Sequence, residues 1–195
     1  MTLENASPRR KELVGIAARL FVETGFDRTT VRMLAQAMGI KSGSLFHHFR
    51  DKQEILCAVI EEGTQRALAI ARRELAEADP RPRARLHAMA RAHLETLLSD
   101  RNAHVAALYE WRRLDAASRE RLVPLRDAYE RLWEQVIDEA IAAGIVTGDA
   151  FLVRRFVLGA LNWTVRWYNP SDTVGEGGRT SEDLARALVA MITRE

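Results

Sequence analysis

The sequence predicts an all-α protein, and three features lead to that prediction. Proline and glycine are sparse, at 5 and 11 of the 195 residues. Nowhere do β-branched residues alternate with polar ones, as they do in a half-buried strand. Apolar residues instead recur three and four positions apart along almost the whole chain, which is typical of amphipathic helices. We expect about nine helices, three in an N-terminal domain and the others in a larger helical C-terminal domain.

The first helix is predicted from its boundary residues and its apolar stripe. Ser7-Pro8 is a good cap and first-turn pair, so a helix should cover 8–24. Gly25 should end it, because glycine can adopt the left-handed cap conformation. The stripe that this helix would bury consists of Leu13, Ile16, Ala17, Leu20 and Phe21.

Two short helices should follow. Thr29 and Thr30 are N-cap candidates for a helix that Gly39 closes. Ser42 can cap a third helix, in which Leu45 and the phenylalanine four residues later point inward. The residues of this helix left largely outside are Ser44, Phe46, His47 and His48.

The rest of the chain contains longer amphipathic stretches. Asp51 should open a helix that Asp79-Pro80-Arg81-Pro82 breaks. A loop with Asn169-Pro170 and Gly175 to Gly178 should precede the last helix. The expected helices cover about 51–78, 83–98, 102–116, 120–143, 150–168 and the segment from 181 onward.

Composition excludes several classes of protein. No apolar stretch approaches the roughly 18 to 20 residues that span a bilayer, and no apolar segment follows the charged N-terminus as in a signal peptide. We therefore expect a cytoplasmic protein that does not enter the membrane. The single cysteine, Cys57, cannot form an internal disulfide, and no Cys/His spacing indicates zinc. We expect neither metal nor cofactor.

Positive charge is concentrated at the N-terminal end. Residues 1–52 contain nine Lys and Arg but five acids, whereas residues 53–195 contain two more acids than bases. All three lysines lie in the first part. This asymmetry indicates a polyanionic partner for 1–52, although a solvated face would give a similar pattern. We expect a domain boundary between 52 and 53.

The second and third helices have the pattern of a helix-turn-helix. A small residue, Ala35, lies where the helices would cross, Gly39 can make the turn, and Leu45 can fill the space between them. The offsets of four and six residues are weak evidence alone, because any tight pair of short helices could show them.

The surrounding residues resemble the DNA-binding domain of TetR-family transcriptional repressors. The resemblance is continuous over about 9–60 and is carried by 17–26, 29–31, 39–49 and Lys52. Two departures are visible. Phe46 stands where the family usually has tyrosine, which removes a hydroxyl expected to touch a phosphate, and Gln53 stands where glutamate is common.

The resemblance implies a DNA-binding surface. In a helix-turn-helix the N-terminal part of the second helix reads base edges in the major groove, while helix ends and cations hold phosphates. Because adjacent helical residues face different ways, we expect at most one of the two histidines to reach DNA. The expected DNA-binding residues are Thr29, Thr30, Lys41, Ser42, Gly43, Ser44, Phe46, His47, His48 and Lys52.

A regulator of this kind should be a homodimer on palindromic double-stranded DNA, because one such domain reads only a few base pairs. The last two helices are the expected interface. The alternative is that their apolar stripes face the subunit's own core. The interface residues expected are Val157, Ala160, Leu161, Thr164, Leu184, Leu188 and Met191.

The C-terminal part is rich in aromatic residues. All four tryptophans and all three tyrosines lie between 109 and 168, which suits either a core or an apolar ligand cavity. Polar and aromatic groups crowd together on adjacent turns at two places, as they do around pockets. The expected effector-binding residues are Tyr109, Trp111, Arg112, Asn162, Trp163, Arg166 and Trp167.

The segment 159–170 also resembles TetR-family repressors that govern fatty-acid or steroid breakdown and respond to acyl-CoA thioesters. The resemblance implies an effector whose acyl chain enters the helical core while arginines such as Arg166 or Arg112 meet the anionic nucleotide. A lipophilic drug or small aromatic compound is the alternative effector.

Catalysis is not expected. Cys57 lies among apolar residues, where it reads as a small buried hydrophobe, and no Ser-His-Asp or paired-carboxylate spacing is visible. The segment Gly175 to Gly178 lacks the preceding strand and the Lys-Ser/Thr of a phosphate loop. A helical adaptor that binds only protein is the remaining alternative class.

Overall fold

The computed structural model describes residues 8–99, 101–168 and 179–194, and these residues form nine α-helices and no strand. The all-α class and the expected number of helices are therefore confirmed. A 3₁₀ turn, η2 (Trp111–Arg113), follows the sixth helix. The helices are α1 (Pro8–Thr24), α2 (Val31–Ala37), α3 (Ser42–Leu45), α4 (Lys52–Glu77), α5 (Pro82–Ser99), α6 (Arg101–Glu110), α7 (Ala116–Ala142), α8 (Ala150–Trp167) and α9 (Ser181–Ile192).

Most helix ends lie where the sequence places them. Gly25 follows α1 with φ of +87°, the left-handed conformation expected there. The hydroxyl of Thr30 caps α2 by accepting the backbone N–H of Met33. Ser7 and the segment 169–178, with its expected loop, lie outside the described residues.

The expected helix over 102–116 is wrong in its second half. α6 ends at Glu110, and α7 begins at Ala116, about four residues earlier than expected. The reason is a local cap, because the Asp115 carboxylate accepts the backbone N–H of Ser118 at 2.7 Å and starts the next helix there. Leu114, just before it, is extended and buried.

The chain packs as two compact units. The first comprises Met1–Gln65 and Asp100–Arg126, and the second comprises Arg66–Ser99 and Asp127–Glu195. Helices α4 and α7 contribute residues to both units, whereas α1, α2, α3 and α6 belong to the first.

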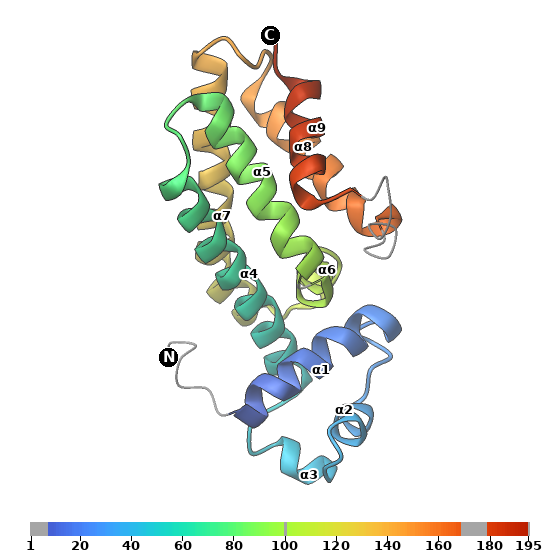
Figure 1. Cartoon of the computed structure of the whole chain (residues 1–195). Coiled ribbons are helices and arrows are strands. Elements are labelled where there is room, and N and C mark those ends of the chain that lie inside the picture. The colour runs from blue at the N-terminus through green and yellow to red at the C-terminus, as the bar shows by residue number, and fades with distance from the viewer. Residues whose placement is uncertain (1–7, 100, 169–178, 195) are drawn as a thin grey trace. The chain divides into compact units, whose positions relative to one another are not determined.

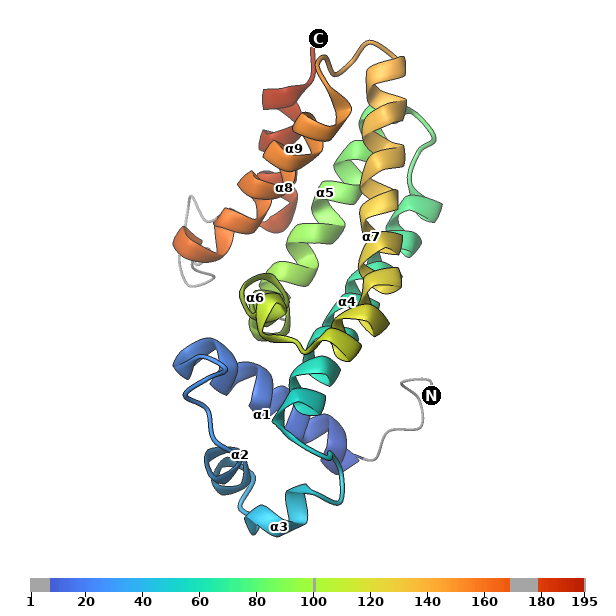
Figure 2. The ribbon, with the colours of Figure 1, turned by 180° about the vertical axis from the view of Figure 1, so that it is seen from behind.

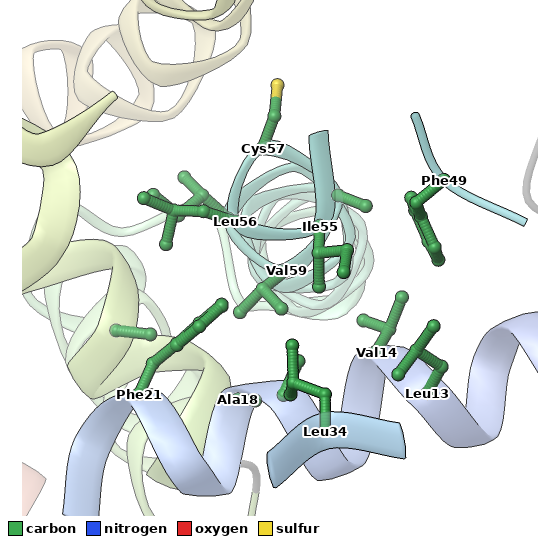
Figure 3. Packing of buried hydrophobic residues seen from close by; sticks show 14 of the residues in the cluster. Leu13, Val14, Ala18, Phe21, Leu34, Phe49, Ile55, Leu56, Cys57 and Val59 are labelled. Carbon is green, nitrogen blue, oxygen red and sulfur yellow. The ribbon is translucent and has the colours of Figure 1, made fainter. Parts of the chain in front are cut away.

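One hydrophobic core holds the first unit together. Figure 3 shows Leu13, Phe21 and Leu34 converging on Ile55 and Val59 of α4. Ala103 and Ala106 of α6 belong to the same core, and α6 packs on α1. α4 and α6 approach so closely that a Cβ on Gly63 would lie 3.1 Å from that of Ala103. The helix-turn-helix is thus built on a framework that includes α6 and the start of α4.

The second unit is a bundle in which α9 lies along α5 (Figures 1 and 2). α8 also packs on α5. Its core contains the fully buried Trp133 of α7 together with Leu86 and Met89 of α5. None of the helices in the described part of the chain is both long and apolar enough to cross a membrane.

Candidate functional site

The turn between α2 and α3 is built around Gly39. Gly39 has φ of +67°, its N–H donates to Gln36 O, and the N–H of Ile40 donates to Ala35 O at 3.0 Å. These two bonds define a Schellman motif, which ends a helix and redirects the chain. Ala35 and Leu45 are almost completely buried between the two helices. The three residues that indicated a helix-turn-helix therefore occupy the expected places.

The outer face of α3 is accessible. Lys41, Gly43, Phe46 and His47 are exposed, and Phe46 retains 53% of its surface. Ser42, Ser44 and His48 are half-buried. His47 therefore projects further than His48, as expected if only one of the pair reaches DNA. In the described part of the chain, no carboxylate lies within 4.0 Å of Lys41, so its charge is not neutralised there.

The N-cap of α3 differs from expectation by one residue. Lys41, not Ser42, is extended and precedes the helix, and its carbonyl accepts the N–H of Ser44 at 2.9 Å. Ser42 is consequently the first helical residue. Its hydroxyl makes no cap, so it can face outward with Ser44.

The two threonines before α2 have different roles. Thr30 is exposed at the N-terminus of α2, where we expected a phosphate contact. Thr29 is completely buried, and its hydroxyl lies 2.8 Å from Gly25 O and 3.2 Å from Leu20 O. A buried hydroxyl that donates to these carbonyls fixes the loop after α1, and a phosphate cannot reach it. We therefore leave Thr29 out of the DNA-contacting surface.

Lys52 is also tied to the protein. Its ammonium lies 2.8 Å from Phe26 O, 2.9 Å from Thr29 O and 3.4 Å from Asp27 O. It also lies 4.2 Å from the centre of the Phe26 ring, close enough for a cation–π contact. Three carbonyls thus accept the three N–H groups, and Lys52 holds the loop between α1 and α2. We propose that this structural role replaces the phosphate contact expected for Lys52 from sequence.

The helix-turn-helix is connected to the segment around η2 by polar contacts within the first unit. The Gln53 amide donates to Arg113 O at 2.7 Å and accepts the N–H of Asp115 at 3.1 Å. Arg113 forms an ion pair with Asp27 at 3.0 Å. The Glu110 carboxylate accepts the N–H of Phe26 at 3.4 Å. Both the start of α4 and the end of α1 are therefore linked to η2.

The first expected effector cluster does not form an enclosed site. Tyr109 is 56% exposed, and Arg112 is exposed as well. Trp111 packs against the core of the first unit, and the Arg126 guanidinium lies 5.0 Å from the centre of its ring. These residues therefore form a surface of the first unit.

The second expected cluster divides between two faces of α8. Trp163 and Trp167 are 59% and 54% exposed, and Arg166 lies 5.8 Å from the centre of the Trp163 ring. They belong to the outer face of the helix. Asn162 instead turns inward, where its Oδ1 lies 3.0 Å from Nε2 of His93.

His93 is the centre of a polar cluster inside the second unit. Only 2% of its surface is exposed, and its Nδ1 lies 2.9 Å from the Tyr129 hydroxyl. The fully buried Trp133 meets the His93 ring edge-on, with the ring centres 5.9 Å apart. Desolvation raises the pKa of Tyr129 above its ordinary value, so the phenol stays neutral and can donate. The cluster brings α5, α7 and α8 together.

Sequence analysis missed His93, Tyr129 and Trp133 as functional candidates, although each occupies an apolar position of a helix. A histidine at such a position is the signal that could have found them, because a buried imidazole requires polar partners. Among the described residues, no group of three or more His, Cys, Asp or Glu could hold a metal ion.

Comparison with known proteins agrees with these features. Residues 13–59 match the family described as bacterial regulatory proteins, tetR family, and 79–195 match the tetracyclin repressor-like C-terminal domain. The HTH-type transcriptional repressor KstR2 of Rhodococcus jostii RHA1 is 34% identical over 191 residues, which are 95% of this chain and 90% of that protein.

Two solved structures are similar over nearly the whole chain. The superantigen PfiT is 43% identical with a TM-score of 0.76, over 97% of this chain and 98% of that one. AibR, solved with isovaleryl coenzyme A and operator DNA, is 23% identical with a TM-score of 0.80, over 94% of this chain and 97% of that one. At that identity, the likeness to AibR concerns the fold alone.

Proposed function

The chain belongs to the tetR family of bacterial regulatory proteins, and from that premise we propose that it is a dimeric repressor released from a palindromic operator by an acyl-CoA thioester. As a DNA-binding transcriptional repressor of this family it is not an enzyme. We take 1–52 as the DNA-binding domain and 53–195 as the effector-binding and dimerisation domain.

The observation that carries DNA binding is the Gly39 turn, which presents α3 with an accessible outer face. In this arrangement α3 enters the major groove, and its first residues meet base edges. Gly43 allows close approach, since no atom lies within 4 Å of a Cβ built there. The residues that we propose at the DNA are Thr30, Lys41, Ser42, Gly43, Ser44, Phe46 and His47.

The dimer face that we propose is the exposed apolar side of α8 and α9. Phe156 retains 73% of its surface, Trp163 59% and Met191 82%. Leu152, Phe156, Trp163 and Trp167 fall on one side of α8 by helical spacing. Several large apolar side chains exposed on one face of a helix are typical of an interaction site, and a two-fold pairing of α8 and α9 would cover them.

This face replaces part of the interface expected from sequence. Val157, Leu161 and Thr164 are at most 5% exposed within the chain itself, so they face the subunit's own core. Leu188 is also buried within the chain, at 9% exposure, and we propose that these four residues belong to the subunit's own core. Ala160 and Met191 remain accessible to a partner.

The effector site that we propose centres on the His93 cluster. Its hydroxyl, imidazole and amide groups lie within an apolar helix bundle, the mixture that binds a ligand with one polar group on an apolar body. An acyl thioester has that character. The resemblance of 159–170 to acyl-CoA-responsive repressors, and the coenzyme A thioester bound by a protein of the same fold, support this choice over a lipophilic drug.

The test is a fluorescence-anisotropy titration of a palindromic duplex from the region upstream of the gene. A scrambled duplex is the DNA control, and acyl-CoA thioesters, their free acids and small aromatic compounds are the effector panel. We expect tight binding to the palindrome and release by a thioester but not by its acid. Release by an aromatic compound alone would favour the alternative effector, and failure to bind any duplex would favour an adaptor.

A pair of variants locates the effector site. Asn162→Ala should leave operator affinity unchanged. It should raise the thioester concentration needed for release by about tenfold, because the bound effector would lose a hydrogen bond to the Asn162 amide. The matched control is Asn102→Ala, which removes a half-buried asparagine of α6. This variant should need the same thioester concentration for release as the wild type. Equal responses of the two variants would place the effector elsewhere.

A further inference from the structure

A groove lies at the end of the second unit, lined by the start of α5, the end of α7 and part of α9. Figure 1 shows the ribbons of these three helices. It has a volume of about 1010 Å³. Its polar lining is mostly cationic and comprises Arg81, Arg83, His87, Glu182, Arg186 and Arg194. None of these residues belongs to the DNA-contacting surface or to the His93 cluster.

Two of the four arginines are already neutralised. Arg81 makes two hydrogen bonds to the Asp79 carboxylate, at 2.9 and 3.0 Å. Arg186 forms an ion pair with Glu182 at 2.9 Å. Ion pairs of this kind satisfy both guanidinium and carboxylate, so these two arginines add little net charge to the groove.

Arg83 and Arg194 are different. Among residues 8–99, 101–168 and 179–194, no carboxylate lies within 4.0 Å of either guanidinium. The Arg83 guanidinium donates instead to the backbone carbonyl of Arg194, which holds the two residues next to each other. The groove lining therefore includes two arginines, Arg83 and Arg194, whose positive charges the described carboxylates do not compensate.

The backbone adds to this positive potential. Pro82 is the first residue of α5, an 18-residue helix without an acidic residue in its first turn, and the Asp79 carboxylate before it accepts the N–H of Arg81 at 2.9 Å. The N-terminal end of a helix carries a partial positive charge and backbone N–H groups without helical partners. The groove also has an apolar wall formed by Ile145, Val189 and Ala190. A ligand that fits these features combines a dianion with an apolar or aromatic body.

We propose that this groove binds a phosphate-bearing small molecule, with the phosphates at Arg83, Arg194 and the start of α5. Guanidinium groups and helix N-termini are both recurrent features of phosphate sites in proteins. The proposal stands independently of the operator and of the His93 cluster. Free nucleotides and the nucleotide part of coenzyme A share the required chemistry.

The test is calorimetric titration of the full-length protein with pyrophosphate, adenosine 3′,5′-bisphosphate and coenzyme A. We expect saturable binding that the double variant Arg83→Gln, Arg194→Gln weakens by about tenfold or more. The control is Arg72→Gln, Arg131→Gln, which removes two exposed arginines of α4 and α7 outside the groove and should bind as wild type.

A second variant distinguishes a loss of ligand binding from a folding defect. Ala190→Glu adds a negative charge at an exposed position of the groove wall, and it should prevent binding while the thermal unfolding curve stays close to wild type. Wild-type affinity in the double variant, or no saturable binding of any of the three compounds, would overturn the proposal. Tighter binding of coenzyme A than of the bisphosphate would support the site and identify a coenzyme A ester as its ligand, and equal binding would support a free nucleotide.

Discussion

Gln53 shows how one side chain connects two parts of the first unit. Its amide N–H donates to Arg113 O, and its amide oxygen accepts the N–H of Asp115. A glutamate, common at this position in the family, carries no N–H and could satisfy only the second contact. The presence of Gln53 in place of glutamate is therefore explained by the segment around η2, which offers one acceptor, Arg113 O, and one donor, the N–H of Asp115.

Lys52 gives the first prediction at the residue scale. Lys52→Met should lower the free energy of unfolding by about 2 kcal/mol, because three carbonyls and the Phe26 ring lose a cation. The slope of operator affinity against salt concentration should not change, since the ammonium is held by the protein. Denaturant unfolding and anisotropy titrations at several salt concentrations measure the two quantities.

The salt dependence decides between this structural role and the phosphate contact expected from sequence. A phosphate contact would reduce the slope by about one. The slope measured for Lys52→Met can be compared with that of Arg32→Gln, which removes an exposed cation of α2. Nothing in the described structure neutralises Arg32. A reduced slope for Lys52→Met with unchanged stability would restore the phosphate contact.

At the scale of the element, the start of α4 depends on a charged cap. The Asp51 carboxylate accepts the N–H of Glu54 at 2.8 Å, and the Glu54 carboxylate accepts the N–H of Arg50 at 2.7 Å. The backbone N–H of Glu54, followed by the Arg50 guanidinium, holds the pKa of Asp51 below its ordinary value of 3.8. The folded protein thus favours the ionised form.

This cap makes stability depend on pH in a defined direction. Because the pKa is lower in the folded state, the contribution of Asp51 is complete above about pH 4 and is lost as the pH falls through the folded pKa. Asp51→Asn keeps an acceptor but not the charge, and should cost about 0.5 kcal/mol at pH 7. Denaturant unfolding between pH 7 and pH 3 should show the difference from wild type shrinking below pH 4. A constant difference over this range would contradict the assignment.

Two glycines of the helix-turn-helix, Gly39 and Gly43, differ in backbone conformation, and alanine substitutions at the two positions should therefore have different effects. Gly39 has φ of +67°, so Gly39→Ala should cost about 1 kcal/mol through backbone strain, although there is space for the added methyl group. Gly43 has no such φ and equal space, so Gly43→Ala should leave stability unchanged and weaken operator binding where the backbone approaches DNA. Thermal unfolding and anisotropy separate the effects. Unchanged operator affinity of Gly43→Ala would show that α3 does not approach DNA closely there.

The elements with strong local signals could be predicted from sequence, whereas packing between distant residues could not. Caps and breakers placed α1, α2 and α9 within a residue or two, because their determinants are neighbours in the chain. The roles of Thr29 and Lys52 depend on carbonyls of the loop between α1 and α2, and residue types alone do not fix that geometry. Likewise, the crowding of polar and aromatic residues on adjacent turns grouped Asn162 with Trp163 in one expected cluster, but burial separated them.

At the scale of the whole molecule, the proposed recognition of a palindromic operator requires two copies of the DNA-binding domain. Half-sites of a palindrome lie about 34 to 36 Å apart, and the two α3 helices must match that distance. An effector can release DNA only if it binds the conformations with a mismatched distance more tightly than the matched one. In the proposed mechanism, dimerisation is therefore a condition both of operator binding and of its control by the effector.

The apolar face of α8 gives the prediction at this scale. Phe156→Glu should dissociate the dimer, because a charge would replace the most exposed aromatic side chain of that face and would have to be desolvated on pairing. Operator affinity should fall by roughly a hundredfold, since a monomer contacts one half-site only. Sedimentation velocity gives the mass, and anisotropy gives the affinity. Ala69→Glu, at an exposed position of α4, introduces the same charge elsewhere in the second unit and should stay dimeric. An unchanged mass for Phe156→Glu would mean that another surface joins the subunits, and the exposed tryptophans of α8 would then require a different partner.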